Sequence, residues 1–293
     1  MAFNGLPSVF ADKVQNDQLY VQKRIYQALK FLTLLPVEQN ETGLFTNYLT
    51  GDIQTGEPQY TNNGIDFNEI KFGQGQTVGG QTLPLGFKYI ANTRDEQRGR
   101  YEYNLQSFYN TAVVKIADFF EDKYSKAVLD GGRVSTATLK AWTSASNIIE
   151  NELAIDDEMR YDSNDEATGY APDTALVSRA DKLAIEKALR KEDYTPNFTY
   201  IASHKISDGD MAFFDSNNPG ATIEKYADPE YNIIQALAND GITETEDGTP
   251  ILPGFINVKE DKTGRPQTVD YYVWVESNLN MRDSNGFLIV KGN

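Results

Sequence analysis

The chain has 293 residues with no cysteine, a single histidine and a formal net charge of −16. Its 40% hydrophobic and 24% charged residues are typical of a globular protein of one large domain or two smaller ones. The lack of cysteine excludes disulfides and thiol catalysis, and one histidine leaves a zinc site almost without ligands. We therefore predict no cofactor and no metal centre. No apolar run approaches the roughly 18 residues of a membrane span.

The N-terminal region predicts a helix over residues 8–35 that ends at Pro36. Its apolar positions recur at steps of three, four or seven: Phe10, Val14, Val21, Ile25, Ala28, Leu32 and Leu35. Almost all of this stripe precedes any compact domain, so we expect another surface to cover it. The first seven residues lack the basic and apolar stretches of a signal peptide, so we expect synthesis in a cytoplasm.

Residues 43–90 change character, because nine of the 22 glycines lie between Gly43 and Gly86. Short alternating pieces at 65–67 and 70–72 indicate strands. A phosphate-loop interpretation of the glycines fails, since Val78 stands where the third glycine of Gly-x-Gly-x-x-Gly is needed. We predict a long extended β-loop with little core of its own.

The rest of the chain predicts an α+β fold. A helix of roughly 45 Å should run from Arg100 to Asp130 and end at Gly131-Gly132. A second helix is expected over 136–159, with one apolar face. The residues of that face are Trp142, Ala145, Ile149 and Leu153. Further elements are a strand at 174–177, a helix opened by Ser178 and Asp181, a strand at 198–206, a helix starting at Asp228-Pro229-Glu230 and ending at Gly241, and strands at 255–260, 268–275 and 287–290.

Acidic residues concentrate between Glu150 and Asp173, where nine acids accompany one base, Arg160. A solvated acidic loop is one interpretation and a calcium site is the other. The run from Asp162 begins like an EF-hand loop, but Ala167 replaces the expected glycine and Asp173 the expected glutamate. The acidic balance also argues against a direct grip on nucleic acid, which needs a basic face.

An enzyme acting on carbohydrate is one alternative, because 17 tyrosines, 2 tryptophans and many carboxylates suit sugars. Such chemistry needs two carboxylates facing one cleft. The candidate clusters are Asp156-Asp157-Glu158 and Asp208-Gly209-Asp210. A Ser-His-Asp triad would have to be built on His204, which lacks the surrounding motif. We predict that the protein is not an enzyme.

The order of segments resembles the major capsid protein of tailed phages, the Hong Kong 97-like fold. Three passages carry the likeness: Ser8–Lys13 leading into Leu29–Leu32, then Val114–Phe120, and finally Ile148–Leu153 followed by Pro172–Asp181. They are similar to the family's N-terminal arm, its spine helix and the helix–strand–helix passage of its axial domain. The chain departs from the family after Gly241, in the acidic loop from Thr243 to Pro250.

By that resemblance the parts are an N-arm (1–42), an extended loop (43–90), a peripheral domain (91–132 and 263–293) and an axial domain (133–262). It implies a coat protein that assembles with itself into pentamers and hexamers around double-stranded DNA without sequence-specific binding. Its place would be the virion, assembled in the host cytoplasm. Scaffold, portal and decoration proteins would be further partners.

The first 90 residues present apolar side chains that do not form a closed core, so we predict that partner subunits cover them. These predicted interface residues are Phe10, Ile25, Phe45, Tyr48, Phe67 and Phe72. A tail protein or the shell of a nanocompartment remains an alternative. The family's lysine–asparagine cross-link is not predicted, because nothing marks a partner for Lys71 or Lys88.

Overall fold

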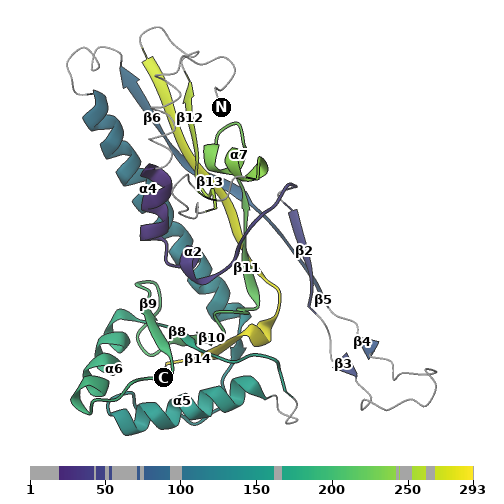
Figure 1. The fold of residues 1–293 in the computed structure, drawn as a ribbon, viewed down its shortest axis with the longest axis vertical. Helices are drawn as coiled ribbons and strands as arrows, with labels where there is room; N and C mark the ends of the chain where they lie inside the picture. Colours follow the sequence, from purple (N-terminus) through teal and green to yellow (C-terminus); the bar gives the residue numbers. More distant parts are fainter. Residues whose placement is uncertain are drawn as a thin grey trace.

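The computed structural model describes residues 20–42, 44–49, 53–54, 71–72, 76–92, 101–161, 167–241, 244, 253–261 and 268–292. Two five-stranded sheets make up the body, and the long helix α4 (Tyr101–Gly131) reaches from one to the other (Figure 1). A two-stranded ribbon projects to one side. The predicted mixed α+β class is confirmed, and α4 lies within one residue of the predicted long helix.

The first sheet, called here the upper sheet, is built around one long central strand. Its strands are β1 (Val37–Gln39), β11 (Ala221–Tyr226), β13 (Thr268–Met281), β12 (Asn257–Asp261) and β6 (Leu83–Asn92). One edge of β13 pairs with β6 over ten residues, and the other edge pairs first with β12 and then with β11. Alternate residues of β13 from Tyr271 to Leu279 are buried, as expected of a strand with one covered face.

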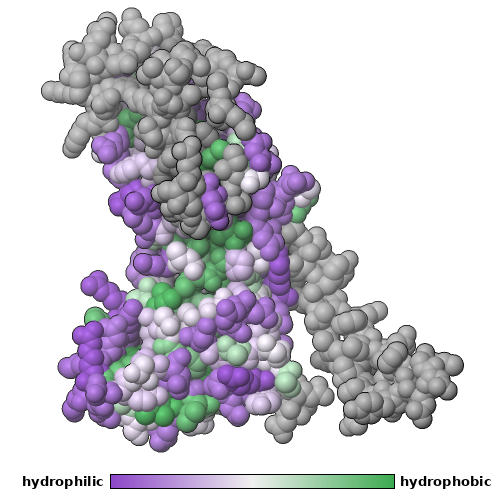
Figure 2. All heavy atoms as spheres, viewed as in Figure 1, coloured by the Kyte–Doolittle hydropathy of each residue, from purple (hydrophilic) through white to green (hydrophobic). Residues whose placement is uncertain are grey.

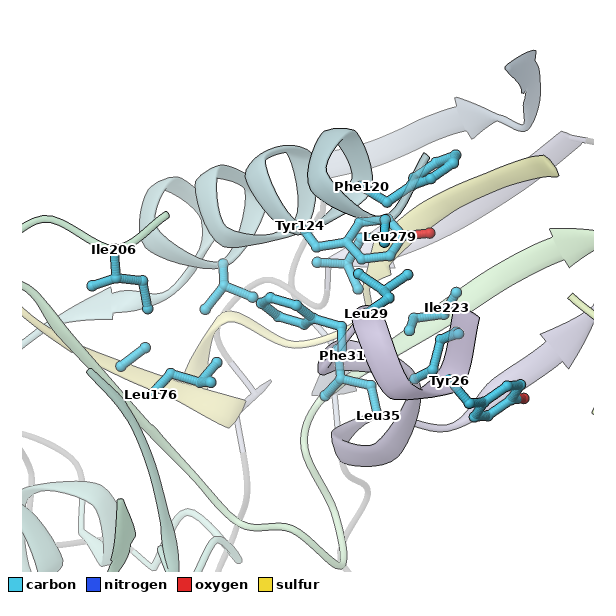
Figure 3. Packing of buried hydrophobic residues seen from close by; sticks show 14 of the residues in the cluster. Tyr26, Leu29, Phe31, Leu35, Phe120, Tyr124, Leu176, Ile206, Ile223 and Leu279 are labelled. Carbon is cyan, nitrogen blue, oxygen red and sulfur yellow. The ribbon is translucent and has the colours of Figure 1, made fainter. Parts of the chain in front are cut away.

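The N-terminal segment packs inside this body. Residues 20–28 are helical, and a short helix α2 (Phe31–Leu34) follows before Pro36. In Figure 3, Leu29 and Phe31 point toward Tyr124 of α4 and Leu279 of β13, and the Phe31 and Tyr124 rings are 5.7 Å apart. Tyr124 in turn shares a 2.6 Å hydrogen bond with Ser277 of β13. The chain itself therefore covers this part of the apolar stripe.

The expectation that Ile25 lies at a subunit interface is wrong. Its side chain is 0% exposed within its own chain, as are those of Val21 and Leu29. The sequence could not show that α4 and the upper sheet return to cover residues that precede them by a hundred positions. Residues 8–19 of the predicted helix lie outside the described residues.

The second sheet, called the lower sheet, has the order β7-β14-β10-β8-β9. Its strands are β7 (Arg133–Val134), β14 (Phe287–Val290), β10 (Met211–Phe214), β8 (Thr174–Val177) and β9 (Thr199–Ala202). A 3-10 turn, η1 (Ser284–Gly286), leads from β13 to β14. Every residue of β8 and β10 is buried, so these strands are central. The predictions of β8, β9 and β14 are confirmed, whereas β10 and β11 were missed.

Helix α5 (Ala145–Arg160) begins nine residues later than predicted. The preceding segment instead runs back along the helix and is held there by side chains of α5. The Asn151 amide exchanges two 2.8 Å hydrogen bonds with the backbone of Lys140, and Glu158 accepts hydrogen bonds from Thr136. These bonds satisfy the backbone outside a helix, which periodicity alone does not reveal.

The predicted apolar face of the 136–159 segment is only partly confirmed, because Ala145 is buried and Trp142 packs against the core but Leu153 does not. Ile148, Glu152 and Ile155 face the core, whereas Leu153 is 58% exposed. Glu152 can be buried because its carboxylate accepts a 2.8 Å hydrogen bond from the Tyr200 hydroxyl and another from the backbone N–H of Asn197. Burial raises the pKa of Glu152. A buried carboxylate thus takes a position that the sequence assigned to the polar side.

The other two helices differ in how well their starts were predicted. Helix α6 (Arg179–Lys191) begins as expected, with Ser178 Oγ accepting a 3.0 Å hydrogen bond from the Asp181 backbone N–H. Helix α7 (Ile233–Asn239) begins later than the predicted Asp228, because Asn232 is the residue that caps it, accepting from Gln235 N–H.

Strand pairing crosses the predicted domain boundaries. Strands β11 and β12 belong to the segment predicted as axial, yet both pair with β13 from the segment predicted as peripheral. Conversely, β14 comes from the predicted peripheral segment and pairs with β10 and β7 in the lower sheet. The two sheets are therefore assembled from interleaved stretches of sequence.

The ribbon consists of strands from the glycine-rich region. Its strands are β2 (Leu44–Leu49), β3 (Ile53–Gln54), β4 (Lys71–Phe72) and β5 (Gln76–Gln81). Strand β2 pairs with β5 over six residues, and β3 pairs with β4 farther out (Figure 1). After Thr82 the chain continues as β6 into the upper sheet. The ribbon is thereby anchored at one end to the body.

Candidate assembly surfaces

The ribbon is the first candidate surface, because each of its strands has a single neighbour among the described strands. The sheets that contain β2, β3, β4 and β5 are two-stranded, with no further pairing in the described part of the chain. An isolated two-stranded ribbon is marginally stable in water at best. Its outer edges also offer free N–H and C=O groups to another chain. A ribbon of this kind becomes more stable when another chain pairs with one of its edges.

Three predicted interface residues belong to strands of this ribbon. Phe45 is opposite Gly80, Tyr48 is opposite Thr77, and Phe72 is opposite Ile53. Phe10 and Phe67 lie outside the described residues. These five residues stay predictions as contacts between subunits.

The base of the ribbon is fixed by close backbone packing. Gly86 of β6 lies opposite Trp274 of β13, and a Cβ added at Gly86 would lie 2.4 Å from the Trp274 Cβ. Only glycine fits there. Farther along β6, one aromatic from each of β6, β13 and α4 stacks, with Tyr89 5.4 Å from Phe108 and 6.5 Å from Tyr271. The direction in which the ribbon leaves the body is thus determined by the upper sheet.

Several large apolar side chains of the described residues remain exposed on the body. They are Phe87, Ile90, Val114, Phe119, Val134, Leu153, Tyr161 and Leu183, together with Leu44 at the start of the ribbon. Their exposure was not predicted from the sequence. For Leu183 a signal existed, because the inward stripe of α6 is Ile185, Ala188 and Leu189, and Leu183 lies out of phase with it. Figure 2 shows such hydrophobic (green) residues among hydrophilic ones.

A buried carboxylate lies where the N-terminal segment meets α4. Glu121 is 1% exposed, and its Oε2 accepts a 3.2 Å hydrogen bond from the backbone N–H of Lys30. Its Oε1 has no hydrogen-bond partner among the described residues. Burial raises the pKa of Glu121 because the charged form loses water that is only partly replaced.

His204 lies at the surface, with its side chain 58% exposed. Its Nε2 is 2.8 Å from Asp118 Oδ1, which the Lys205 ammonium also reaches at 2.8 Å. Hydrogen bonds from Lys205 and then from His204 lower the pKa of Asp118 to about 2. The cluster joins α4 to the loop after β9 and places the histidine in a surface hydrogen bond.

The two carboxylate clusters weighed as catalytic have separate structural roles. Asp156 pairs with Arg160 one turn on, while Glu158 binds Ser135 and Thr136. In the second cluster, Asp210 accepts a hydrogen bond from the Gly292 backbone N–H. Asp156, Glu158 and Asp210 are thus each engaged with another part of the chain.

The stretch weighed as a calcium loop is described only in part, because residues 162–166 lie outside the described residues. Asp173 accepts 2.8 Å and 2.5 Å hydrogen bonds from the backbone N–H and the hydroxyl of Ser216, as in a turn cap. Within the described ranges, His, Cys, Asp and Glu side chains do not gather in threes as a metal ion requires. No helix among those ranges is long and apolar enough to cross a membrane.

Comparison with known proteins finds the likeness in structure rather than in sequence. No protein-family model and no curated protein matches the chain. A virus-like particle from Pyrococcus furiosus matches with a TM-score of 0.60 at 12% identity, over 96% of this chain and 99% of the other. The capsid of an empty GTA particle matches with a TM-score of 0.53 at 13% identity, over 90% of each chain.

A structure of Mycobacterium phage Cain also matches, with a TM-score of 0.53 at 10% identity over 91% of each chain. The chain has a capsid-type fold. The Hong Kong 97-like capsid fold expected from the order of segments is thereby confirmed. Each of these likenesses extends over at least 90% of both chains.

Proposed function

We propose that the protein is the major coat subunit of a tailed double-stranded DNA virus. The observation that carries the proposal is the two-stranded ribbon on a capsid fold, since a projecting ribbon without a third strand gains its stability from a neighbouring subunit. Copies would form pentamers and hexamers that close into an icosahedral shell. The ribbon is then the extended loop of the subunit, and α4 is its spine helix.

The same proposal assigns the remaining parts. Residues 1–42 form the N-arm, of which residues 20–35 stay with their own subunit. The upper sheet with α4 forms the peripheral domain, and the lower sheet with α5 and α6 forms the axial domain. This division follows strand pairing and so differs from the boundaries expected from the sequence. Scaffold, portal and decoration proteins would bind the shell, which assembles in the host cytoplasm.

The charge of the subunit suits a container for DNA. With a formal net charge of −16, a shell wall repels phosphate and leaves the genome free to enter and leave. Enclosure would need no sequence-specific contact. The proposal also makes the protein structural rather than enzymatic, in keeping with the separate structural roles of its carboxylate clusters.

Assembly of the full chain tests the proposal. We expect negative-stain images of the expressed protein to show closed particles, and light scattering to show a mass many times the 32.8 kDa of the subunit. A protein that stays a monomer across salt and concentration would contradict it. Particles from the natural source that protect double-stranded DNA from nuclease support a viral coat, whereas particles enclosing protein cargo indicate a nanocompartment shell.

A further inference from the structure

The outer face of α6 is basic and apolar at once. Its exposed residues repeat at helical spacing and are Arg179, Ala180, Leu183, Ala184, Lys187, Arg190 and Lys191. Leu183, in the first two turns, is 59% exposed, although leucine on a charged helix face usually turns inward. The two acids of this helix are engaged within it, because Asp181 caps its start and Glu186 contacts Lys182 and Arg190. The face therefore carries an excess of positive charge around one leucine.

A hollow adjoins this leucine. It has a volume of about 390 Å³ and lies between the start of α6 and the loop that follows β9. Its lining includes Arg179, Leu183, His204, Ile206 and Asp208. Ala180, Leu183 and Ile206 give the hollow an apolar part, and its charged lining residues are Arg179 on α6 and Asp208 on the loop. The side nearest α6 therefore suits an apolar side chain that carries a carboxylate beside it.

The outer face of α5 has the complementary character. Its exposed residues are spaced by four, three, four and three positions: Ser146, Glu150, Leu153, Asp157 and Arg160. Leu153 is 58% exposed at the centre, with Glu150 and Asp157 one turn away on either side. Lys140 pairs with Glu150, whereas Asp157 makes no ion pair among the described residues. This face is an exposed leucine flanked by acids.

Helices α5 and α6 contact each other at the edge of the lower sheet. In Figure 1, α5 runs along the bottom edge of the molecule and α6 stands at its left. In Figure 2, green residues interrupt the lower edge, while the left edge is mostly purple. Leu153 and Leu183 are both exposed, so the two faces do not cover each other within the subunit. They can meet between copies, and repetition of such a head-to-tail contact forms a ring when the rotation between copies closes.

We propose that the α5 face of one copy docks on the α6 face of the next copy. Leu153 enters the hollow beside Leu183, and Glu150 and Asp157 lie against Arg179 and Lys187 of the neighbour. The inference rests on the proposed shell function and adds the contact that joins copies within a ring. A second copy is favoured over another partner because the same chain supplies both the leucine flanked by acids and the basic hollow.

Charge reversal tests the contact in the full chain. One variant carries Glu150→Lys and Asp157→Lys, and the other carries Arg179→Glu and Lys187→Glu. Like charges then face each other, so we expect the concentration needed for assembly to rise by at least about tenfold in each variant. Combining all four changes in one chain restores opposite charges across the contact. We expect assembly of the combined variant to return to within about threefold of wild type.

A matched control carries Lys115→Glu and Lys126→Glu, two exposed lysines of α4. It makes the same change in net charge as the α6 variant and should assemble like wild type. Circular dichroism melting of every variant verifies that the subunit still folds. If the control also fails, or if the combined variant is not rescued, charge at these two faces does not join the copies and the inference is overturned.

The remaining outcomes separate this inference from the proposed function. Wild-type protein that never assembles would overturn both. Wild-type shells together with normal shells from both reversed variants would overturn the docking contact alone. An α6 variant that forms normal shells but loses nuclease-protected nucleic acid would assign the basic face to nucleic acid instead. Mixing the two reversed variants tests the geometry, because one then carries two basic faces and the other two acidic faces. Each variant can dock only on the other, so the mixture should form rings with an even number of subunits and no rings with an odd number.

Discussion

The N-terminal segment and the ribbon were both expected to be covered by other subunits, but they differ in how much of them is buried within their own chain. Residues 20–35 are covered by their own chain, so that Ile25 is 0% exposed beneath α4 and the upper sheet. The ribbon has no third strand among the described residues. An apolar stripe that precedes a domain in the sequence can therefore be covered by later elements of the same chain rather than by another subunit. We therefore expect folding and assembly to depend on different parts of the first 92 residues.

Replacing the ribbon gives the largest expected effect. A Gly/Ser linker in place of residues 45–80 should leave a subunit that melts cooperatively and forms no shells, because the missing contacts lie between subunits. Light scattering and thermal melting measure the two properties. The matched variant replaces residues 45–89 and so also removes most of β6, which pairs with β13 over ten residues. We expect this second variant to fail to fold.

An unfolded first variant would mean that the ribbon belongs to the core of the monomer. Normal shells from that variant would mean that the ribbon has no part in assembly. Either result would remove the contrast between the ribbon and the N-terminal segment.

Ile25→Ala tests whether the N-terminal segment is buried within its own chain. Removing a fully buried isoleucine should lower the free energy of unfolding by about 2–5 kcal/mol. The measurement is denaturant unfolding of the ribbon-replaced chain, in which assembly does not add to stability. Arg24→Ala, at the exposed neighbouring position, should change stability by less than about 0.5 kcal/mol. Equal effects at the two positions would contradict the burial of this segment.

Glu121→Gln sharpens the same contact between the N-terminal segment and α4. The raised pKa means that the folded state holds its proton to higher pH than the unfolded state does. Stability therefore falls as the pH rises through the window above the ordinary glutamate pKa. The amide removes this cost, so we expect the variant to gain about 1 kcal/mol over wild type at pH 8 and less at pH 5.

Thermal melting at the two pH values measures this gain. Asp122→Asn, at the partly exposed neighbouring position, is the control and should not gain stability over wild type. A Glu121→Gln variant that is less stable than wild type at pH 8 would contradict the account of an incompletely satisfied buried carboxylate.

His204→Ala gives the smallest expected effect. The imidazole is exposed, and Lys205 still pairs with Asp118 when the ring is removed. We expect a change in stability of less than about 0.5 kcal/mol. A larger loss of stability would show that the imidazole contributes more to folding than its surface hydrogen bond.

Local signals in the sequence determined much of the secondary structure. Helix α4 was predicted from the helical period of apolar residues between Arg100 and Asp130 and from the two glycines that follow. Such signals are local, because they lie within the helix and at its ends. Ser178 with Asp181 placed the start of α6 for the same reason. The order of these elements was enough to identify the capsid fold. The glycine content likewise marked the region that forms the ribbon.

Tertiary contacts decided what lies inside. Asn151 holds the backbone of Lys140, so α5 starts late, and Tyr200 lets Glu152 be buried while Leu153 turns outward. Strands from interleaved segments of the chain pair within each sheet, and no local pattern encodes which distant segment a strand will pair with. The cover of Ile25 by α4 and the exposure of Leu153 and Leu183 follow from the same cause. Whether an apolar side chain is buried or stays exposed depends on which distant element packs against it.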